Sequence, residues 1–293
     1  MARFGRVVTA MVTPFTEDLA LDVDRAQELA GWLVDQGSDG LVVTGSTGES
    51  ATLSDDEKIT MWRAVAEAVG DRATVIAGTG TYDTAHSIHL TEEGEKAGAD
   101  GILIVTPYYN KPPQRGLVEH FTRIAGATGL PILAYNIPGR TGLRIEHDTL
   151  LRMAEVENIA AVKDSTGDFD AIAHLVREAP DGFEVYSGDD WATFGYVCLG
   201  AVGVVSVAGH VVGERIRQMI EQLETGDVAS ARKLHYELMP VFDALFITSN
   251  PIPLKKAMAL IGQPVGPPRL PLVEANEDEA ARIEVALKEA GVL

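Results

Sequence analysis

With 293 residues, the chain is long enough to bury a large core, either as two ordinary domains or as one large α/β barrel. Its 46% hydrophobic and 23% charged residues are typical of a soluble globular protein, and its apolar stretches are too short to span a bilayer. The net charge of −19 repels phosphate backbones and anionic lipids, so we expect no nucleic-acid partner and no membrane partner.

Eight apolar runs alternate with segments of helical pattern along the first 224 residues. In chain order they are "RVVTAMVTP", "DQGSDGLVVTG", "ATVIAGTG", "KAGADGILIVTP", "LPILAYNIP", "NIAAVKD", "FEVYSGD" and "CLGAVGVVSVAG". The second, fourth and eighth repeat the same order of helix end, glycine turn and strand. Because the runs are apolar throughout, they fit strands buried on both faces, as in a parallel sheet covered by helices.

The segments between the runs have the period of amphipathic helices. Apolar residues share one face of the first segment at Val23, Ala26, Leu29, Ala30 and Leu33, and of the second at Ile59, Trp62, Val65 and Val69. Ser54 with Glu57 forms a capping-box pattern at the start of the second. Each apolar face is expected to pack on the sheet.

This alternation predicts the α/β class and, within it, a (β/α)8 TIM barrel over residues 1–224. A doubly wound sheet is the alternative. It is disfavoured because no run resembles an edge strand and no glycine-rich dinucleotide fingerprint follows the first run. Residues 225–293 continue the helical pattern, broken by "NPIP" and "GQPVGPPRLP", and are expected to form a C-terminal helical extension.

Lys163 ends the run "IAAVK", where a charge is expensive to bury. In a barrel the chemistry gathers at the carboxyl ends of the strands, and Tyr135 ends the run before it, so the two side chains can meet in the lumen beside the small Ala161. One interpretation is a structural ion pair with Asp164 or Asp189. The other is a nucleophile, since a desolvated lysine is partly neutral and can attack a carbonyl to form a Schiff base.

The strand ends resemble those of the class I aldolase family that includes dihydrodipicolinate synthase and N-acetylneuraminate lyase. The matching motifs run in order over nearly the whole chain: "VVTAMVTPF", "GSTGES", "AGTG", "TPYYNKP", "YNIPGRTG", "KDSTGD", "SGDD", "GVVSV" and "NPIPLKKAM". The resemblance implies that Lys163 forms an imine with pyruvate and that Tyr135 moves protons to and from it. It also implies a proton relay of Thr47, Tyr135 and Tyr109, with Tyr109 reaching in from a neighbouring subunit.

By the same resemblance, the "GSTGES" turn holds the pyruvate carboxylate through the N–H groups and hydroxyls of Ser46 and Thr47. The turn is expected to enter a helix, whose N-terminal partial charge favours an anion. Family members commonly have Thr where this chain has Ser46. Gly188 and Val205 match positions that line the pyruvate pocket, Val205 through its backbone carbonyl. From the residues alone, the turn can also be a polar-capped glycine turn, and "YYN" an interface patch.

Arg140 occupies the position that, in synthase-type members, binds the carboxylate of aspartate semialdehyde; a solvent-exposed loop arginine is the alternative. The implied reaction is condensation of pyruvate with L-aspartate 4-semialdehyde to 4-hydroxy-tetrahydrodipicolinate, at the start of diaminopimelate and lysine biosynthesis. Another pyruvate-dependent aldolase, a 2-keto-3-deoxy acid dehydratase, and a catalytically silent keto-acid-binding barrel stay open as alternatives.

Neither a metal nor an organic cofactor is expected. Cys198 is the single cysteine, and His86 and His89 lie on one helix face without a carboxylate ligand pattern. With no disulfide and no leader pattern at the start of the sequence, we expect a cytoplasmic protein. The resemblance implies a homotetramer arranged as a dimer of dimers.

Lysine feedback is expected to be weak or absent. Lysine-inhibited members of the family use an Asn and a Glu where this chain has Tyr82 and His86, so the natural partner of the lysine ammonium is missing. Asp55 and Lys58 fall where two histidines often lie, whereas three other positions match: Ser50, Ala51 and Tyr108.

Overall fold

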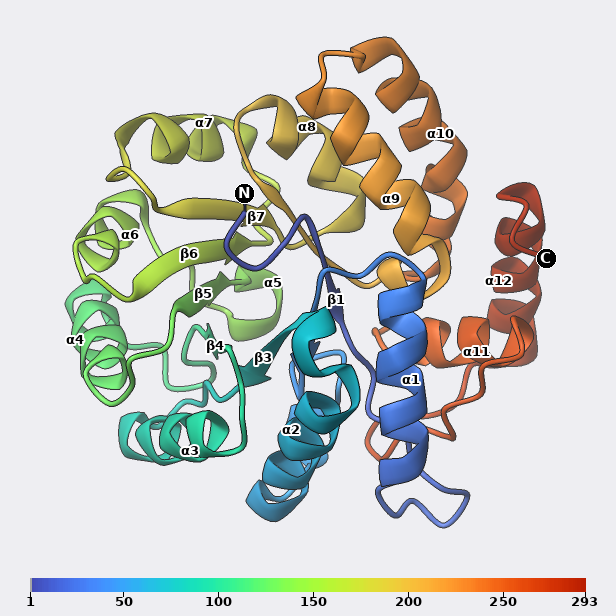
Figure 1. Cartoon of the computed structure of the whole chain (residues 1–293), viewed down its shortest axis with the longest axis horizontal. Coiled ribbons are helices and arrows are strands. Elements are labelled where there is room, and N and C mark those ends of the chain that lie inside the picture. The colour runs from blue at the N-terminus through green and yellow to red at the C-terminus, as the bar shows by residue number, and fades with distance from the viewer. Residues whose placement is uncertain (1) are drawn as a thin grey trace.

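The computed structural model describes residues 2–293, in which parallel strands close into a barrel. Each strand pairs with the next, and the last pairs with the first, as the ring in Figure 1 shows. The strands are β1 (Val7–Ala10), β2 (Gly40–Val43), β3 (Thr74–Gly78), β4 (Gly101–Val105), β5 (Ile132–Asn136), β6 (Ile159–Asp164), β7 (Glu184–Ser187) and β8 (Gly203–Ser206). The predicted (β/α)8 TIM barrel is confirmed.

Helices surround the strands (Figure 1). Those of the barrel are α1 (Val23–Asp35), α2 (Asp55–Val69), α3 (Thr84–Lys96), α4 (Gln114–Ala125), α5 (Pro138–Thr141), α6 (His147–Ala154), α7 (Phe169–Glu178), α8 (Thr193–Cys198) and α9 (Gly209–Glu224). The C-terminal helices are α10 (Val228–Ala244), α11 (Ile252–Leu260) and α12 (Glu277–Glu289). The division into a catalytic barrel over 1–224 and an extension over 225–293 stays a prediction.

The helical periodicity has its expected effect on burial. In α1 the buried positions are Ala26, Leu29, Ala30 and Leu33. The capping box at α2 forms as predicted: Glu57 N donates to Ser54 Oγ at 3.2 Å, and Ser54 N donates to Glu57 Oε2 at 2.9 Å. The segment "IPGRTG" adds the one-turn helix α5, which begins at Pro138 because the fixed φ of proline suits a first helical position.

The barrel has its own core inside the strands, here called the lumen cluster. Its members are Phe4, Val8, Ala10, Val42, Ile76, Leu103, Leu133, Tyr135, Ala161, Tyr186 and Val205. Phe4 and Tyr186 fill the end at which the strands begin, with ring centroids 6.0 Å apart and Phe4 N donating to the Tyr186 hydroxyl at 3.1 Å. The lumen is therefore plugged at that end.

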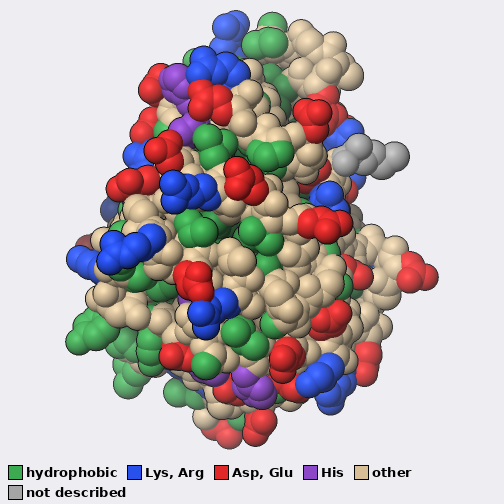
Figure 2. Space-filling model, turned by 90° about the vertical axis from the view of Figure 1, so that its left-hand side faces the viewer, with side chains coloured by type: hydrophobic (Ala, Val, Ile, Leu, Met, Phe, Trp, Pro, Cys, Tyr) green, Lys and Arg blue, Asp and Glu red, His purple; other side chains and the backbone are tan. Residues whose placement is uncertain are grey.

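The surface carries both signs of charge. Figure 2 shows acidic and basic side chains intermingled on one face of the molecule rather than separated by sign. On that face the net charge of −19 is therefore not gathered into one patch. Over residues 2–293, no helix combines the length and the apolar composition needed to cross a bilayer.

Candidate active site

Lys163 and Tyr135 lie side by side where β5 and β6 end. The parallel register pairs Tyr135 with Lys163, because the two strands run in step to their last residues. Lys163 Nζ is 3.9 Å from the centroid of the Tyr135 ring, and the two residues are only 5% and 4% exposed. Ala161, one pleat earlier on the same face, leaves room in the lumen. The structure thus brings together the amine and the phenol that the strand ends predict.

The environment of Lys163 favours the neutral amine. Burial lowers its pKa from 10.5 to about 8, although the carboxylates of Asp189 and Asp190 act in the opposite direction. With a pKa of about 8, roughly a tenth of the amine is neutral at pH 7, far more than for an exposed lysine. Burial also raises the pKa of the Tyr135 phenol, so this group is protonated and can donate. For Asp189, burial raises the pKa to about 6.

A structural ion pair at Lys163 is not formed with Asp164. Asp164 faces the other side of β6, where its carboxylate accepts hydrogen bonds from Tyr196 Oη at 3.0 Å and Asn136 Nδ2 at 2.9 Å. Across residues 2–293, no carboxylate lies within ion-pair distance of the Lys163 amine. Neither suggested partner therefore forms an ion pair with this lysine, and Asp189 acts on it only at longer range.

The turn over residues 45–50 is held in one shape by its own backbone. Glu49 N donates to Ser46 O at 3.2 Å, and Ser50 N donates to Gly45 O at 3.3 Å. Glu49 has a positive φ of 55°. The backbone is crowded at Gly48, because a Cβ there would lie 3.1 Å from Met11 O, which is tighter than ordinary contact.

The helix that this turn enters is a short 3-10 helix rather than α2. It spans Ser50–Thr52, and α2 begins only at Asp55 because Ser54 caps it there. The partial positive charge at the start of α2 is therefore not at the turn. Instead, the N–H groups of Ser46 and Thr47 donate to no other residue within 2–293, which leaves two backbone donors for an anion.

Asn250 is a site residue that the sequence did not reveal. Its Nδ2 donates to Thr47 Oγ1 at 2.9 Å, and its backbone carbonyl accepts from Arg140 Nη2 at 3.1 Å. Asn250 comes from the segment between α10 and α11 and is 203 positions from Thr47 in the chain. The sequence signals were a break in the helical pattern at "NPIP" and the family-like motif "NPIPLKKAM", and neither says what Asn250 contacts.

A cavity of about 260 Å³ opens beside this turn. Ser46, Tyr108, Arg140 and Asn250 are among the residues that line it. Arg140 lies on the one-turn helix α5, directly after β5, and this helix places Arg140 at the same cavity as the turn. A hydroxyl and a fork of N–H donors at one cavity wall suit a small molecule that carries a carboxylate.

The remaining expected site residues are placed as follows. Gly188 follows β7, where a Cβ would lie 3.0 Å from the backbone carbonyl oxygen of Asp164, so the ends of β6 and β7 leave little room for a side chain. Val205 is fully buried in the lumen cluster. Tyr109 is 92% exposed and has a φ of 70°. Within one chain its side chain therefore lies in solvent and not in the barrel lumen, where Lys163 is buried. The structure therefore does not join Tyr109 to Lys163 within a single chain.

The comparisons with known proteins agree with this geometry. The model of the dihydrodipicolinate synthetase family matches residues 3–290. The chain belongs to this family. It is 55% identical over 291 residues to the 4-hydroxy-tetrahydrodipicolinate synthase of Moorella thermoacetica, covering 99% of this chain and 100% of that one. A second relative with that name, from Acidothermus cellulolyticus, is 54% identical, with 99% and 94% covered.

Solved structures of the family superpose closely. Dihydrodipicolinate synthase from Cyanidioschyzon merolae, solved with lysine bound, has a TM-score of 0.97 at 44% identity, with 99% of both chains covered. The enzyme from Acinetobacter baumannii, solved in complex with pyruvate, has a TM-score of 0.96 at 36% identity, with 99% of this chain and 100% of that chain covered. The barrel and its C-terminal helices are therefore the arrangement of this family.

The residues on which the expectation of weak lysine feedback rests make contacts within the chain. His86 Nε2 lies 2.9 Å from Asp55 Oδ2, and Lys58 Nζ lies 3.4 Å from Asp55 Oδ1. Tyr82 packs edge-on against Tyr108, with ring centroids 5.3 Å apart. The sequence missed the contact between His86 and Asp55, because the two residues come from different helices. Within residues 2–293, no group of three or more His, Cys, Asp or Glu side chains is arranged to hold a metal.

Proposed function

We propose that the chain condenses pyruvate with L-aspartate 4-semialdehyde to give 4-hydroxy-tetrahydrodipicolinate, through a Schiff base on Lys163. The observation that carries the proposal is the buried Lys163 amine, with a pKa of about 8, lying 3.9 Å from the Tyr135 ring. Membership of the family and full-length relatives of that name support the same reaction. The product belongs to diaminopimelate and lysine biosynthesis.

Pyruvate binds first in this mechanism, with its carboxylate against the N–H groups of Ser46 and Thr47. The neutral amine of Lys163 attacks the ketone carbon, and the resulting carbinolamine loses water to give the imine. Loss of a methyl proton converts the imine into an enamine. Tyr135, with Thr47 and the Tyr109 of a neighbouring subunit, carries the protons that these steps release and consume.

The enamine carbon then attacks the aldehyde of the second substrate, whose carboxylate is held by the Arg140 guanidinium. Attack of the substrate's amino group on the imine carbon closes the ring and expels the Lys163 amine, which restores the free enzyme. Gly188 and the backbone carbonyl of Val205 line the pyruvate pocket. The bond from Arg140 to Asn250 O, at 3.1 Å, supports this role because it fixes the arginine at the cavity.

The proposal includes a cytoplasmic homotetramer built as a dimer of dimers, with residues 1–224 as the catalytic barrel and 225–293 as the extension. The 92% exposure of Tyr109 supports assembly, because a tyrosine this exposed contributes to a buried site only from another subunit.

Borohydride reduction in the presence of pyruvate tests the proposal. Reduction traps the imine as a stable secondary amine, so peptide mapping by mass spectrometry is expected to place one pyruvate-derived adduct on Lys163. The variant Lys163→Ala is expected to take no adduct at the site. An unmodified Lys163 at saturating pyruvate contradicts the mechanism.

A further inference from the structure

Glu49 ends the turn that carries Ser46 and Thr47, and its side chain is fully buried. Its φ of 55° is in the left-handed region, which a residue with a Cβ adopts only when its surroundings hold it there. Glu49 N donates to Ser46 O at 3.2 Å, so the position of Glu49 fixes that of Ser46. What holds the Glu49 carboxylate therefore also holds the turn.

Both partners of this carboxylate come from the C-terminal helical region. Lys255, on α11, places Nζ 2.7 Å from Glu49 Oε1, and its side chain is only 4% exposed. Arg269 N donates to Glu49 Oε2 at 2.9 Å. The turn of the barrel is thus attached to residues more than 200 positions later in the chain, since the bond from Arg269 spans 220 positions.

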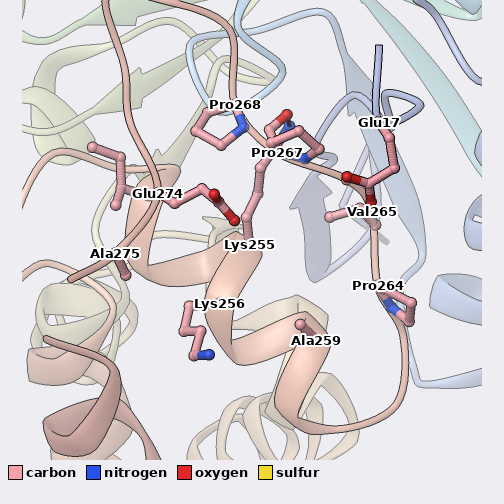
Figure 3. Close-up of a pocket in the computed structure, with 12 residues that line it drawn as sticks. Glu17, Lys255, Lys256, Ala259, Pro264, Val265, Pro267, Pro268, Glu274 and Ala275 are labelled. Atoms are coloured by element: carbon pink, nitrogen blue, oxygen red, sulfur yellow. Dashed lines mark hydrogen bonds between the residues drawn. The ribbon is translucent and has the colours of Figure 1, made fainter. Parts of the chain in front are cut away.

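Further contacts hold the Lys255 amine beside Glu49. Its Nζ also donates to Pro267 O at 3.1 Å and lies 4.5 Å from the centroid of the Phe15 ring. Figure 3 shows the Lys255 side chain running from α11 toward Pro267, while Lys256 extends from the helix in a different direction. Both lysines line a cavity of about 220 Å³ beside α11, but only Lys255 reaches the turn.

A second attachment lies just beyond the turn. The guanidinium of Arg269 bonds Glu57 Oε1 at 2.6 Å and Glu57 Oε2 at 2.9 Å, and it donates to Thr52 O at 3.1 Å. The same residue that contacts Glu49 through its backbone therefore also fixes the start of α2. Together these bonds leave the turn little freedom to move relative to the C-terminal helices.

Lys255 also neutralises the charge of the Glu49 carboxylate, which affects how well the turn binds an anion. The turn offers backbone N–H groups to an anion, and a carboxylate two residues along from Thr47 opposes that anion unless a cation neutralises it. Removing one partner of a buried ion pair leaves the other charge uncompensated, which is more harmful than removing both. Loss of Lys255 alone is therefore worse for the turn than loss of Lys255 and Glu49 together.

We propose that the Glu49–Lys255 ion pair positions the turn over residues 45–50 for the pyruvate carboxylate, so that a lysine of the C-terminal region controls the affinity for pyruvate. This inference rests on the proposed function. Lys255 is a positioning residue, since it acts through Glu49 and does not touch the substrate.

Steady-state kinetics of Lys255→Met, Glu49→Gln/Lys255→Met and the matched control Lys256→Met test the inference. Lys256 follows Lys255 on α11 and forms no hydrogen bond or ion pair with the rest of residues 2–293. We expect Lys255→Met to raise the KM for pyruvate about tenfold, with kcat and the KM for the aldehyde within about threefold of native. The double variant is expected to recover most of the affinity, and Lys256→Met to match the native chain.

A merely structural role lowers the melting temperature without changing the KM for pyruvate, and that result overturns the inference, as does a double variant that binds no better than Lys255→Met. If Lys255→Met does not fold, Lys255→Gln takes its place, because it also leaves the Glu49 carboxylate without a cation: a KM for pyruvate raised about tenfold at unchanged kcat supports positioning, and a native KM refutes it. Borohydride trapping separates the two failures. No adduct on Lys163 of the native chain refutes the proposed function, whereas a native adduct with unchanged pyruvate dependence in the variants refutes only this inference.

Discussion

The reactivity of Lys163 depends on pH in a way that the structure quantifies. A lysine with a pKa of 10.5 is about 0.03% neutral at pH 7, whereas one with a pKa of about 8 is about 10% neutral, a gain of roughly 300-fold. The carboxylate of Asp189 is the largest influence that opposes this lowering. The change Asp189→Asn removes that charge while keeping the shape of the side chain. We therefore expect the pKa of Lys163 to fall further.

The neutral fraction also bounds the size of this effect. Because it cannot exceed one, Asp189→Asn can accelerate imine formation at pH 7 by at most about tenfold, and by almost nothing above about pH 9. The assay is the initial rate of borohydride trapping at saturating pyruvate, measured from pH 6 to about 10. The control is Asp164→Asn, whose carboxylate lies on the other face of β6, bonded to Tyr196. A native midpoint near 10, or a midpoint that rises in Asp189→Asn, refutes the reasoning.

Other changes test other parts of the molecule. Arg140→Ala is expected to lower kcat/KM for aspartate semialdehyde about 100-fold while pyruvate trapping stays native; unchanged condensation favours another pyruvate aldolase instead. Burial lowers the pKa of His210 to about 4, so its stabilising effect is present above pH 6.5 and is lost as pH falls, by about 3 kcal/mol between pH 7 and 4. Urea unfolding of native and His210→Gln chains measures this, and equal pH slopes contradict it. A lysine dose series is expected to show weak or no inhibition, because the family resemblance places His86 where lysine-inhibited members have an acid for the lysine ammonium; strong inhibition at low lysine refutes this. Finally, mixed inactive Tyr109→Ala and Lys163→Ala chains are expected to regain activity after subunit exchange if the tyrosine acts in trans; a mixture that stays inactive contradicts that role.

Much of this arrangement follows from local sequence pattern. Strands alternate their side chains with a period of two, and parallel strands end at one rim, so Lys163 and Tyr135 can be paired from sequence alone. The same logic collects Ser46, Arg140 and Gly188 at that rim. These inferences succeed because each depends only on a residue's position within its own strand or turn.

The features that sequence did not reveal depend on contacts between distant segments. Asn250 and Lys255 reach the turn near Thr47 from the C-terminal helices, and no periodicity records such a pairing. The contact between His86 and Asp55 joins neighbouring helices in the same way. The left-handed Glu49 is a further case, because its conformation is imposed by partners rather than by an intrinsic preference of glutamate.

The barrel is closed at the end where its strands begin, so its lumen is open to solvent at one end at most. Because Phe4 and Tyr186 close the end at which the strands begin, any molecule that reaches or leaves Lys163 has to pass through the opposite end of the barrel. Under the proposed mechanism, an aldehyde held by Arg140 would lie between Lys163 and solvent, so we expect the keto acid to bind before its co-substrate and the product to leave before the next keto acid binds.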